Sequence, residues 1–377
     1  MLVSHSFSVH TLTRVCMRSV IALTRSLRAT GTALLSSRHM SQIAGPERFR
    51  HKVKVLFSEY GTRIRNRSLR LCYPASGMDA TSHIYIGTAG WSYKDWEGIV
   101  YPAQIKKSQH PVEYLAQYID LLEINTSFYG HIKPEVGKLW CRMAHAVNSD
   151  FLFTAKLNRA FTHSPMAAVE STSAETIRST KEDEGLAKEG LDSIAAEKML
   201  GAVLVQFPIS FKNTDRNRDH LETVIDKFKQ YPLVVEVRHN SWTNEGTLRY
   251  FTQKSVAFCN IDQPRLGKAV QPSDHVTSPL GYVRLHGRNY EQWFDSDSRN
   301  DRYDYLYTDP ELQGWKTRID AIAEKAQKTF VVANNHFEGK AAVNALQLKH
   351  MITGKMVDVP PTLLQRYWEL GQIAGKP

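Results

Sequence analysis

The chain has 377 residues, of which 42% are hydrophobic and 23% are charged. This composition is typical of a soluble globular protein with enough apolar material for one large core or two smaller ones. No apolar run approaches the roughly 20 residues that a membrane-spanning helix needs, so we expect no transmembrane segment and no membrane partner.

The N-terminal 70 residues carry all of the positive excess in the formal net charge of +10. They hold 13 Lys and Arg against two acids, a net of +11, whereas residues 71–377 hold 35 basic and 36 acidic side chains, a net of −1. A basic balance indicates nucleic-acid binding only when the charge lies on the folded domain. Because the body of the protein is neutral, nucleic acid is a partner that we keep open but do not favour.

Residues 1–46 contain five arginines, many Ser and Thr, and no Asp or Glu. This composition is typical of an organellar transit peptide and predicts a mitochondrial protein. The alternative is a disordered extension, or upstream sequence absent from a cytoplasmic protein that starts at Met40 or Met78 instead of Met1. Residues 47–80 are basic and irregular, and we interpret them as a linker.

From residue 81 to residue 355, short apolar runs alternate with helical patterns, which favours an α/β domain with a parallel sheet. Several runs are continuously apolar, as strands covered on both faces require. Eight runs are candidate strands: Ile84–Ile86, Leu121–Ile124, Phe151–Ala155, Ala202–Phe207, Leu233–Val237, Val256–Ile261, Tyr282–Leu285 and Phe330–Ala333.

Apolar stripes with helical spacing separate most of these runs. They lie within residues 112–119, 136–147, 221–228, 248–251, 312–326 and 340–352. A further helix is expected near 186–199, in a segment rich in Ser, Thr, Glu and Lys. Residues 263–280 contain three prolines and no helical period, so we expect this crossover to lack a helix. Residues 356–377 are predicted to form a C-terminal helix and tail.

Eight strands over residues 81–355 predict a TIM-type (β/α)8-like barrel, a fold of typically about 250 residues. An open doubly wound sheet is the alternative, but no GxGxxG motif follows any candidate strand. The glycine pair at Gly87 and Gly90 is too close and lacks the Lys of a phosphate loop. The four cysteines include no CxxC pair, so neither a zinc ribbon nor a redox motif is indicated.

Several multi-residue motifs follow one another along the body. They are Gly87-Thr-Ala-Gly-Trp91-Ser-Tyr93, Trp96-Glu-Gly98, Tyr101-Pro102, Glu123-Ile-Asn125-Thr-Ser-Phe128-Tyr129, Phe153-Thr-Ala-Lys156, Thr162-His163, Gln206-Phe207-Pro208, Glu236-Val-Arg238-His239-Asn-Ser-Trp242, Tyr282-Val-Arg284-Leu-His286-Gly287 and Asn334-Asn335. Over residues 83–353 this set resembles the domain-of-unknown-function 72 family, the YecE-like proteins. The resemblance implies a TIM barrel, distantly similar to xylose isomerase and endonuclease IV barrels, and no settled activity. Two departures are visible: Ala89 stands where family members often have Ser, and residues 164–198 form an elaborated insertion.

In such barrels the C-terminal ends of the strands carry the reactive residues, and residues i and i+2 of a strand share a face. Three motif pairs share a face in this way: Glu123 with Asn125, Glu236 with Arg238, and Arg284 with His286. Three more polar residues lie at strand ends: Lys156, Gln206 and Asn334. The sequence therefore predicts a polar ring at one end of the barrel.

Charges at buried positions need partners, so this ring should be mutually paired. One interpretation is a set of ion pairs that plugs the barrel. The other, which we favour, is a pocket for an anionic, phosphorylated small molecule. In that pocket Lys156, Arg238 and Arg284 supply positive charge. Glu236, or alternatively Glu123, acts as general base, and His286 is its acid partner.

Five more residues complete the predicted ligand-binding set: Asn125, Gln206, Asn334, Trp91 and Tyr129. Trp91 and Tyr129 belong to a group of aromatic residues on the segments that follow the strands. The others in that group are Tyr93, Trp96, Phe128, Trp242 and Trp293. Such rings can stack on a base or a sugar, or they can form an apolar rim that holds long loops in place.

Metal binding and nucleophilic catalysis would depend on other residue patterns. Glu123, Glu236, His239, Asp262 and His286 are ligand types acceptable to zinc or manganese. The three cations of the ring would share their cavity and oppose metal binding, and no HxH or HExxH spacing is present. No nucleophile-elbow motif occurs either. We predict no metal and no cofactor.

These observations favour an enzyme, of hydrolase, lyase or isomerase type, that acts on an anionic small molecule by general acid/base chemistry. One alternative is a nucleic-acid-binding or endonuclease IV-like repair protein, an argument from fold analogy alone. The other is a non-catalytic ligand-binding protein. The oligomeric state is left open.

Overall fold

The computed structural model describes residues 84–105, 109–164, 177–290 and 301–375. The expectations for residues 1–46 and 47–80, and the aromatic Trp293, lie outside these residues. Within them, eight parallel strands form a closed barrel in sequence order, which confirms the predicted TIM-type fold. The strands are β1 (Ile84–Ala89), β2 (Leu121–Ile124), β3 (Leu152–Lys156), β4 (Leu200–Gln206), β5 (Leu233–Glu236), β6 (Ala257–Asp262), β7 (Leu280–Leu285) and β8 (Lys328–Ala333).

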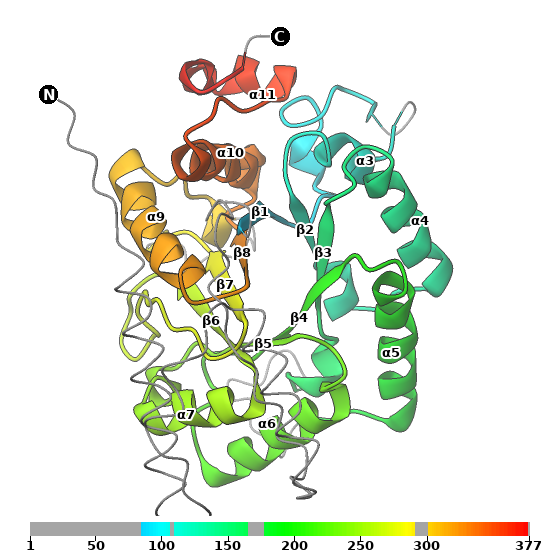
Figure 1. The fold of residues 1–377 in the computed structure, drawn as a ribbon, viewed down its shortest axis with the longest axis vertical. Helices are drawn as coiled ribbons and strands as arrows, with labels where there is room; N and C mark the ends of the chain where they lie inside the picture. The colour runs from blue at the N-terminus through cyan, green and yellow to red at the C-terminus, as the bar shows by residue number, and fades with distance from the viewer. Residues whose placement is uncertain (1–83, 106–108, 165–176, 291–300, 376–377) are drawn as a thin grey trace, which may run out of the picture. The chain divides into compact units, whose positions relative to one another are not determined.

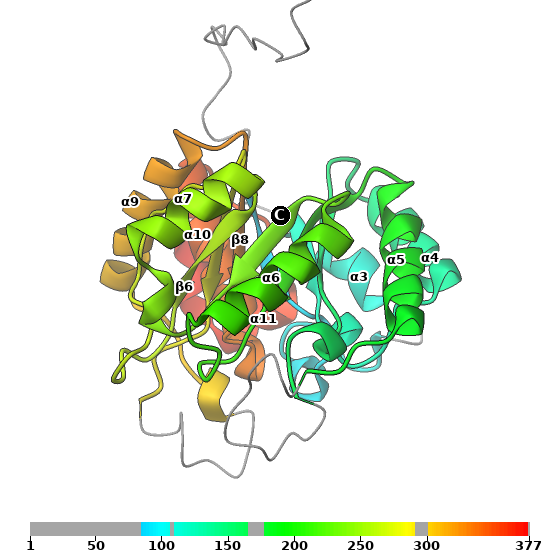
Figure 2. The same ribbon diagram turned by 90° about the horizontal axis from the view of Figure 1, so that it is seen from below.

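Helices surround the strands as an outer ring (Figure 1). They are α3 (Pro111–Leu115), α4 (Pro134–His145), α5 (Lys181–Ala195), α6 (Asp215–Phe228), α7 (Glu245–Lys254), α9 (Asp309–Ala323) and α10 (Lys340–Thr353), followed by α11 (Pro361–Arg366) and the short 3-10 helix η10 (Trp368–Gln372). Figure 2 shows α6 and α7 on the same side of the barrel. Among the described residues, no helix combines the length and apolarity that crossing a membrane requires.

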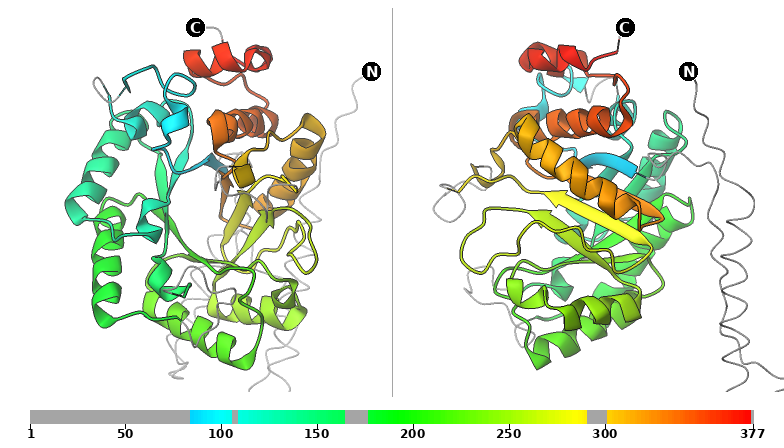
Figure 3. Two further views of the ribbon diagram at one scale, coloured as in Figure 1. Left: turned by 180° about the vertical axis from the view of Figure 1, so that it is seen from behind. Right: turned by 60° about the vertical axis from the view of Figure 1, so that its left-hand side comes forward.

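The link between β6 and β7 has no helix, as its three prolines predicted. The helix predicted near 186–199 begins earlier, at Lys181, because Thr180 and Asp183 form a capping box at its start. It ends at Ala195, and Lys198 adopts a left-handed φ of 61° just beyond it. In Figure 3, α9 (orange) runs beside β7 (yellow) and covers that side of the sheet.

Aromatic side chains fill the barrel toward the N-terminal ends of its strands. The Phe330 ring lies 5.5 Å from the Tyr85 ring and 6.0 Å from the Tyr282 ring, between centroids. Gly201 makes room for Phe330, because a Cβ there would lie 2.7 Å from the ring carbon Cζ. The Tyr282 hydroxyl is hydrogen-bonded to Thr154 across the interior, at 2.9 Å. Aromatic rings therefore occupy this end of the barrel interior, below the charged side chains described next.

Candidate functional site

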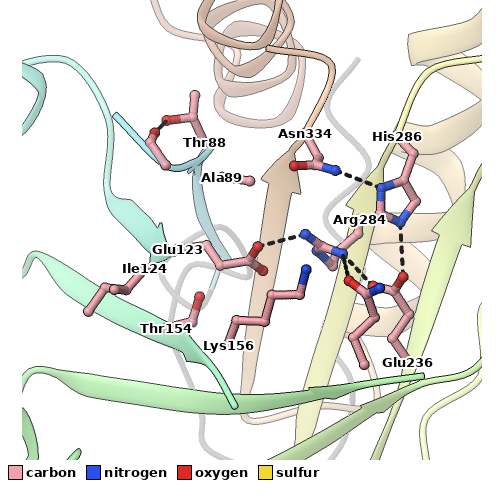
Figure 4. Close-up of polar contacts among 12 residues, drawn as sticks. Thr88, Ala89, Glu123, Ile124, Thr154, Lys156, Glu236, Arg284, His286 and Asn334 are labelled. Carbon is pink, nitrogen blue, oxygen red and sulfur yellow. Dashed lines mark hydrogen bonds and ion pairs between the residues drawn. The ribbon is translucent and has the colours of Figure 1, made fainter. Parts of the chain in front are cut away.

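Arg284 crosses the interior of the barrel and joins two carboxylates on opposite sides of it (Figure 4). Its Nη2 donates to Glu123 Oε1 at 2.7 Å, and its Nη1 donates to Glu236 Oε2 at 2.5 Å. The side chains are 1% exposed for Arg284 and 0% exposed for both acids. Because β7 neighbours neither β2 nor β5, these bonds run through the barrel and tie three strands together.

The two acids are fully engaged in this arrangement. The second oxygen of Glu123 accepts from the Tyr282 hydroxyl at 2.9 Å, and Glu236 Oε1 accepts from Arg238 Nε at 2.9 Å. Burial by itself would raise the pKa of Glu236, but the charges of Arg284 and Arg238 hold this pKa well below its usual range. Glu236 is therefore a stable carboxylate and a weak base.

His286 extends the network on the other side of Glu236. Its Nε2 lies 3.2 Å from Glu236 Oε1, and its Nδ1 lies 2.8 Å from Asn334 Nδ2. Burial lowers the pKa of His286 to about 3, so the ring is neutral at pH 7. Nε2 also lies 3.4 Å from Arg238 Nη2, but the contact with Glu236 is shorter. With an amide donating to Nδ1, we assign the proton to Nε2, which donates to Glu236.

Lys156 ends β3, and its amine points toward Arg284 inside the barrel (Figure 4). Its Nζ lies 4.2 Å from the centre of the Phe128 ring. Within the described part of the chain, Nζ has no hydrogen-bond or ion-pair partner, and the side chain is partly exposed. Burial, followed by the charge of Arg284, lowers the pKa of Lys156 to about 7, against the smaller opposite effects of Glu123 and Glu236. We call Glu123, Lys156, Glu236, Arg238, Arg284 and His286 the mouth cluster.

His163 is a neighbour of the mouth cluster that the sequence prediction did not include. Its ring packs edge-on against Phe128, with 4.9 Å between centroids, and its Nδ1 lies 2.9 Å from Thr162 Oγ1. Burial and the charges of Lys156 and Arg238 lower the pKa of His163 to about 3. The motif Thr162-His163 was visible in the sequence, but it follows β3 in a loop, where strand alternation gives no direction.

Tyr93 is a second neighbour that was left out of the predicted site. Its hydroxyl donates to the Ala89 carbonyl at 2.5 Å, and its ring stacks on His336 with centroids 4.1 Å apart. Burial raises the pKa of Tyr93, and the charges that act on it include those of Glu123 and Arg284. It belonged to the aromatic group noted in the sequence, but nothing there distinguished it from the others.

Other predicted ligand-binding residues lie at different depths around the cluster. Gln206 Oε1 accepts from Arg284 Nη1 at a long 3.4 Å. Asn125 has a buried Oδ1 with no hydrogen-bond partner among the described residues. Tyr129 is 65% exposed at the rim. Trp91 is 6% exposed and packs edge-on against Trp140 of α4, with centroids 5.0 Å apart, so its ring is part of the packing between barrel and helix.

The residue types weighed as metal ligands do not converge. His239 Nδ1 accepts from the backbone N–H of Ser241 at 3.1 Å and caps a short 3-10 helix. In the part of the chain that the structure describes, no three His, Cys, Asp or Glu side chains form a group that could hold a metal ion.

Asp262 belongs to a separate ion-pair network on the outside of the barrel. It pairs with Arg288 Nε at 2.8 Å and accepts from Trp315 Nε1 of α9 at 3.0 Å. Arg288 also contacts Glu311 at 2.8 Å through Nη1. Burial raises the pKa of Asp262 despite the charge of Arg288. We call Asp262, Arg288, Glu311 and Trp315 the flank network.

Comparison with known proteins identifies the family. A family model described as "Protein of unknown function DUF72" matches residues 85–366. The chain is 25% identical over 294 residues to the UPF0759 protein YunF of Bacillus subtilis (strain 168), a match that covers 75% of this chain and 100% of YunF.

Solved structures agree with this assignment. The DUF72 family protein TM1631 of Thermotoga maritima MSB8 is 31% identical, with a TM-score of 0.61 over 72% of this chain and 99% of that one. A DUF72 family protein (EF0366) of Enterococcus faecalis V583 is 25% identical, with a TM-score of 0.61 over 74% of this chain and 98% of that one. The chain belongs to the DUF72 family, as its motifs predicted.

Proposed function

We propose that this member of the DUF72 family is an enzyme that binds an anionic small molecule at the mouth of its barrel and transfers a proton to or from it. The observation that carries the proposal is the Lys156 amine, which lies beside Arg284 and has no hydrogen-bond or ion-pair partner among the described residues. The other fixed charges of the mouth cluster balance, since two guanidinium groups face two carboxylates. A protonated Lys156 therefore leaves one positive charge that a bound anion would match.

Arg238 is the second group suited to hold the anion. Its side chain is 15% exposed, whereas that of Arg284 is 1% exposed. Both Nη groups of Arg284 are engaged by carboxylates inside the barrel. We therefore assign ligand contact to Arg238 and Lys156, and we assign to Arg284 the role of holding the two acids in place.

Lys156 is also the group best matched to proton transfer near neutral pH. A general base is most effective when its pKa lies near the working pH, and the pKa of Lys156 is about 7. Glu236 and His286, the acid/base pair expected from the sequence, are buried and hydrogen-bonded to each other and to neighbours. The proposal gives this pair a positioning role and moves the proton-transfer role to Lys156.

The test is thermal unfolding of the full chain with inorganic phosphate and with oxalate, small anions that need no knowledge of the substrate. A ligand that binds only the folded state raises Tm as its concentration rises. We expect this rise in the wild type and a smaller one in Arg238→Gln and Lys156→Met. Arg249→Gln is the matched control, because Arg249 is 63% exposed and pairs with Glu245 of the same outer helix, α7.

Equal Tm shifts in all four proteins would refute the anion site. A shift that depends on Arg238 and Lys156, but with no exchange of carbon-bound hydrogens of small 2-oxo acids in D2O, would favour the non-catalytic alternative. A response to oligonucleotides that falls steeply with salt would favour the nucleic-acid alternative.

A further inference from the structure

We infer that Lys156 is a covalent site: its amine forms an imine with the carbonyl carbon of a small molecule that also carries an anionic group, such as a 2-oxo acid or a phosphorylated aldehyde. The inference rests on the proposed function and narrows its substrate class. It also assigns to this barrel a reaction type that anion binding alone does not imply.

The first support is the position of the amine. Lys156 lies at the C-terminal end of β3, where barrel enzymes carry out their chemistry. Its side chain is partly accessible, and its Nζ has no hydrogen bond or ion pair with any residue that the structure describes. A lysine whose role is structural would be expected to pair with a carboxylate. The oxygens of Glu123 and Glu236 instead accept hydrogen bonds from other side chains.

The second support is the set of groups that face this amine. Burial most strongly opposes a positive charge on Nζ, and the charges of Arg284 and, less strongly, Arg238 oppose it too, while Glu123 and Glu236 favour the charge. His163, from the loop after β3, faces the same amine as a neutral ring. The result is a pKa of about 7, so half of the amine is the neutral nucleophile at pH 7. Lysines activated for imine formation are perturbed in this way, by burial or by a neighbouring cation.

The Phe128 ring acts in the opposite direction, because a cation over a ring face is stabilised. The ring lies 4.2 Å from Nζ. Phe128 also gives the amine an apolar wall, which limits the access of water from that side.

The step balances without an oxidant or a metal. The nitrogen lone pair attacks the carbonyl carbon, a C–N bond forms, and the carbonyl electron pair moves to oxygen. That oxygen leaves as water with the two amine hydrogens, and a C=N bond remains. Once protonated, this nitrogen draws electrons from the adjacent carbon, so that the proton there passes to solvent water; in this step Lys156 withdraws electrons and does not accept the proton. Hydrolysis later restores the amine and the carbonyl. Arg238 would bind the anionic group and orient the carbonyl toward Nζ.

The experiment traps the imine in the full chain with sodium borohydride, with glyoxylate and glycolaldehyde phosphate as probes. Reduction fixes the C–N bond, so the intact mass should increase by the mass of the probe less one oxygen atom. We expect one adduct per chain at pH 7, mapped to Lys156 by peptide analysis. Lys229 is the internal control: it is 72% exposed and belongs to a surface ion pair. A lysine amine free in water is almost entirely protonated at pH 7, so Lys156 should react at least about tenfold faster than this surface residue.

Two variants complete the design. Lys156→Arg keeps a positive charge but cannot form an imine, and it should lose the adduct. Arg238→Gln should keep Lys156 but weaken trapping of both anionic probes. Adducts spread over surface lysines with none at Lys156 would overturn the inference. If phosphate still raises Tm in that case, the proposed anion site stands without the imine; if it does not, both proposals fall.

Discussion

The flank network and the mouth cluster both bury carboxylates against guanidinium groups near the C-terminal ends of the strands, but they are completed differently. In the flank network, Asp262 is bound by Arg288 and by Trp315 of α9, and Arg288 reaches on to Glu311. Every charged group there has a protein partner. In the mouth cluster, the Lys156 amine has no hydrogen-bond or ion-pair partner among the described residues.

The two networks arise from neighbouring positions on the same sheet. Ile261 is in register with Arg284, and Asp262 is in register with Leu285, so successive residues of β6 and β7 face opposite sides. The inward face leads to the mouth and the outward face to α9. Both networks use the same residue types, so residue type does not tell a structural ion pair from a candidate site here. The two differ in whether every charged side chain has a partner elsewhere in the protein.

Substitution of Arg284 should have the largest effect and would break the mouth cluster. Arg284→Met leaves Glu123 and Glu236 buried without their shared cation, and breaking a buried ion pair in this way is destabilising by roughly 3–5 kcal/mol. Urea unfolding at pH 7 measures the loss. A loss below about 1 kcal/mol would mean that water or a rearranged Lys156 takes over the role of Arg284.

The matching change in the flank network should have a smaller effect. Arg288→Met removes a partner of Asp262, but burial already raises the pKa of Asp262, so this acid can take up a proton and avoid remaining charged. Arg288 is also 17% exposed. We expect a loss of about 1–3 kcal/mol, within the range for removing a hydrogen-bond partner from a buried group. The Tm shift with phosphate should be unchanged, and its loss would contradict the separation of the two networks.

The sequence predicted the barrel and the inward direction of several charged residues of the mouth cluster. Eight apolar runs and one helix-free crossover correspond to the observed barrel, because strand period and proline content are local properties. Alternation also placed Glu123, Glu236 and Arg284 toward one interior, where the structure joins them. Alternation could not indicate that both Nη groups of Arg284 are hydrogen-bonded to the two acids. Those contacts depend on distances across a closed barrel.

Loop and rim residues were the least predictable. Trp91 was expected beside the pocket, but it packs on Trp140 of α4, and only the course of the chain after β1 decides between these positions. His163 was part of a motif but was not included in the predicted site. It lies beyond the end of β3, where the alternation of a strand no longer predicts the direction of a side chain. Strand ends can thus be assigned to a face from sequence, whereas loop side chains need the tertiary fold.

A finer change tests how the mouth cluster holds His286. Asn334→Asp replaces the donor at Nδ1 with a carboxylate, so that an imidazolium would lie between two acids. We expect the pKa of His286 to rise from about 3 toward its ordinary value of about 6.5. The titration of this imidazole by NMR measures the change. Asn334→Ala is the control, because it removes the donor without adding charge, and an equal rise there would contradict the electrostatic explanation.

The last prediction concerns the pH dependence of the free energy of unfolding in Lys156→Met. It distinguishes an unpaired amine at Lys156 from an amine held in an ion pair. The pKa of Lys156 is about 7 in the folded chain and about 10.4 in an unfolded one. Between these values the unfolded state binds the extra proton, so the free energy of unfolding of the wild type should rise with pH over this window.

Lys156→Met lacks this titration. The difference in unfolding free energy, wild type minus variant, should therefore grow from pH 7 to pH 10 by roughly 3 kcal/mol. All other titrating groups cancel in the difference, and Lys229→Met, at a surface lysine that is 72% exposed, is the matched control. A flat line for Lys156→Met would mean that the amine is held as an ammonium ion, paired like the charges of the flank network.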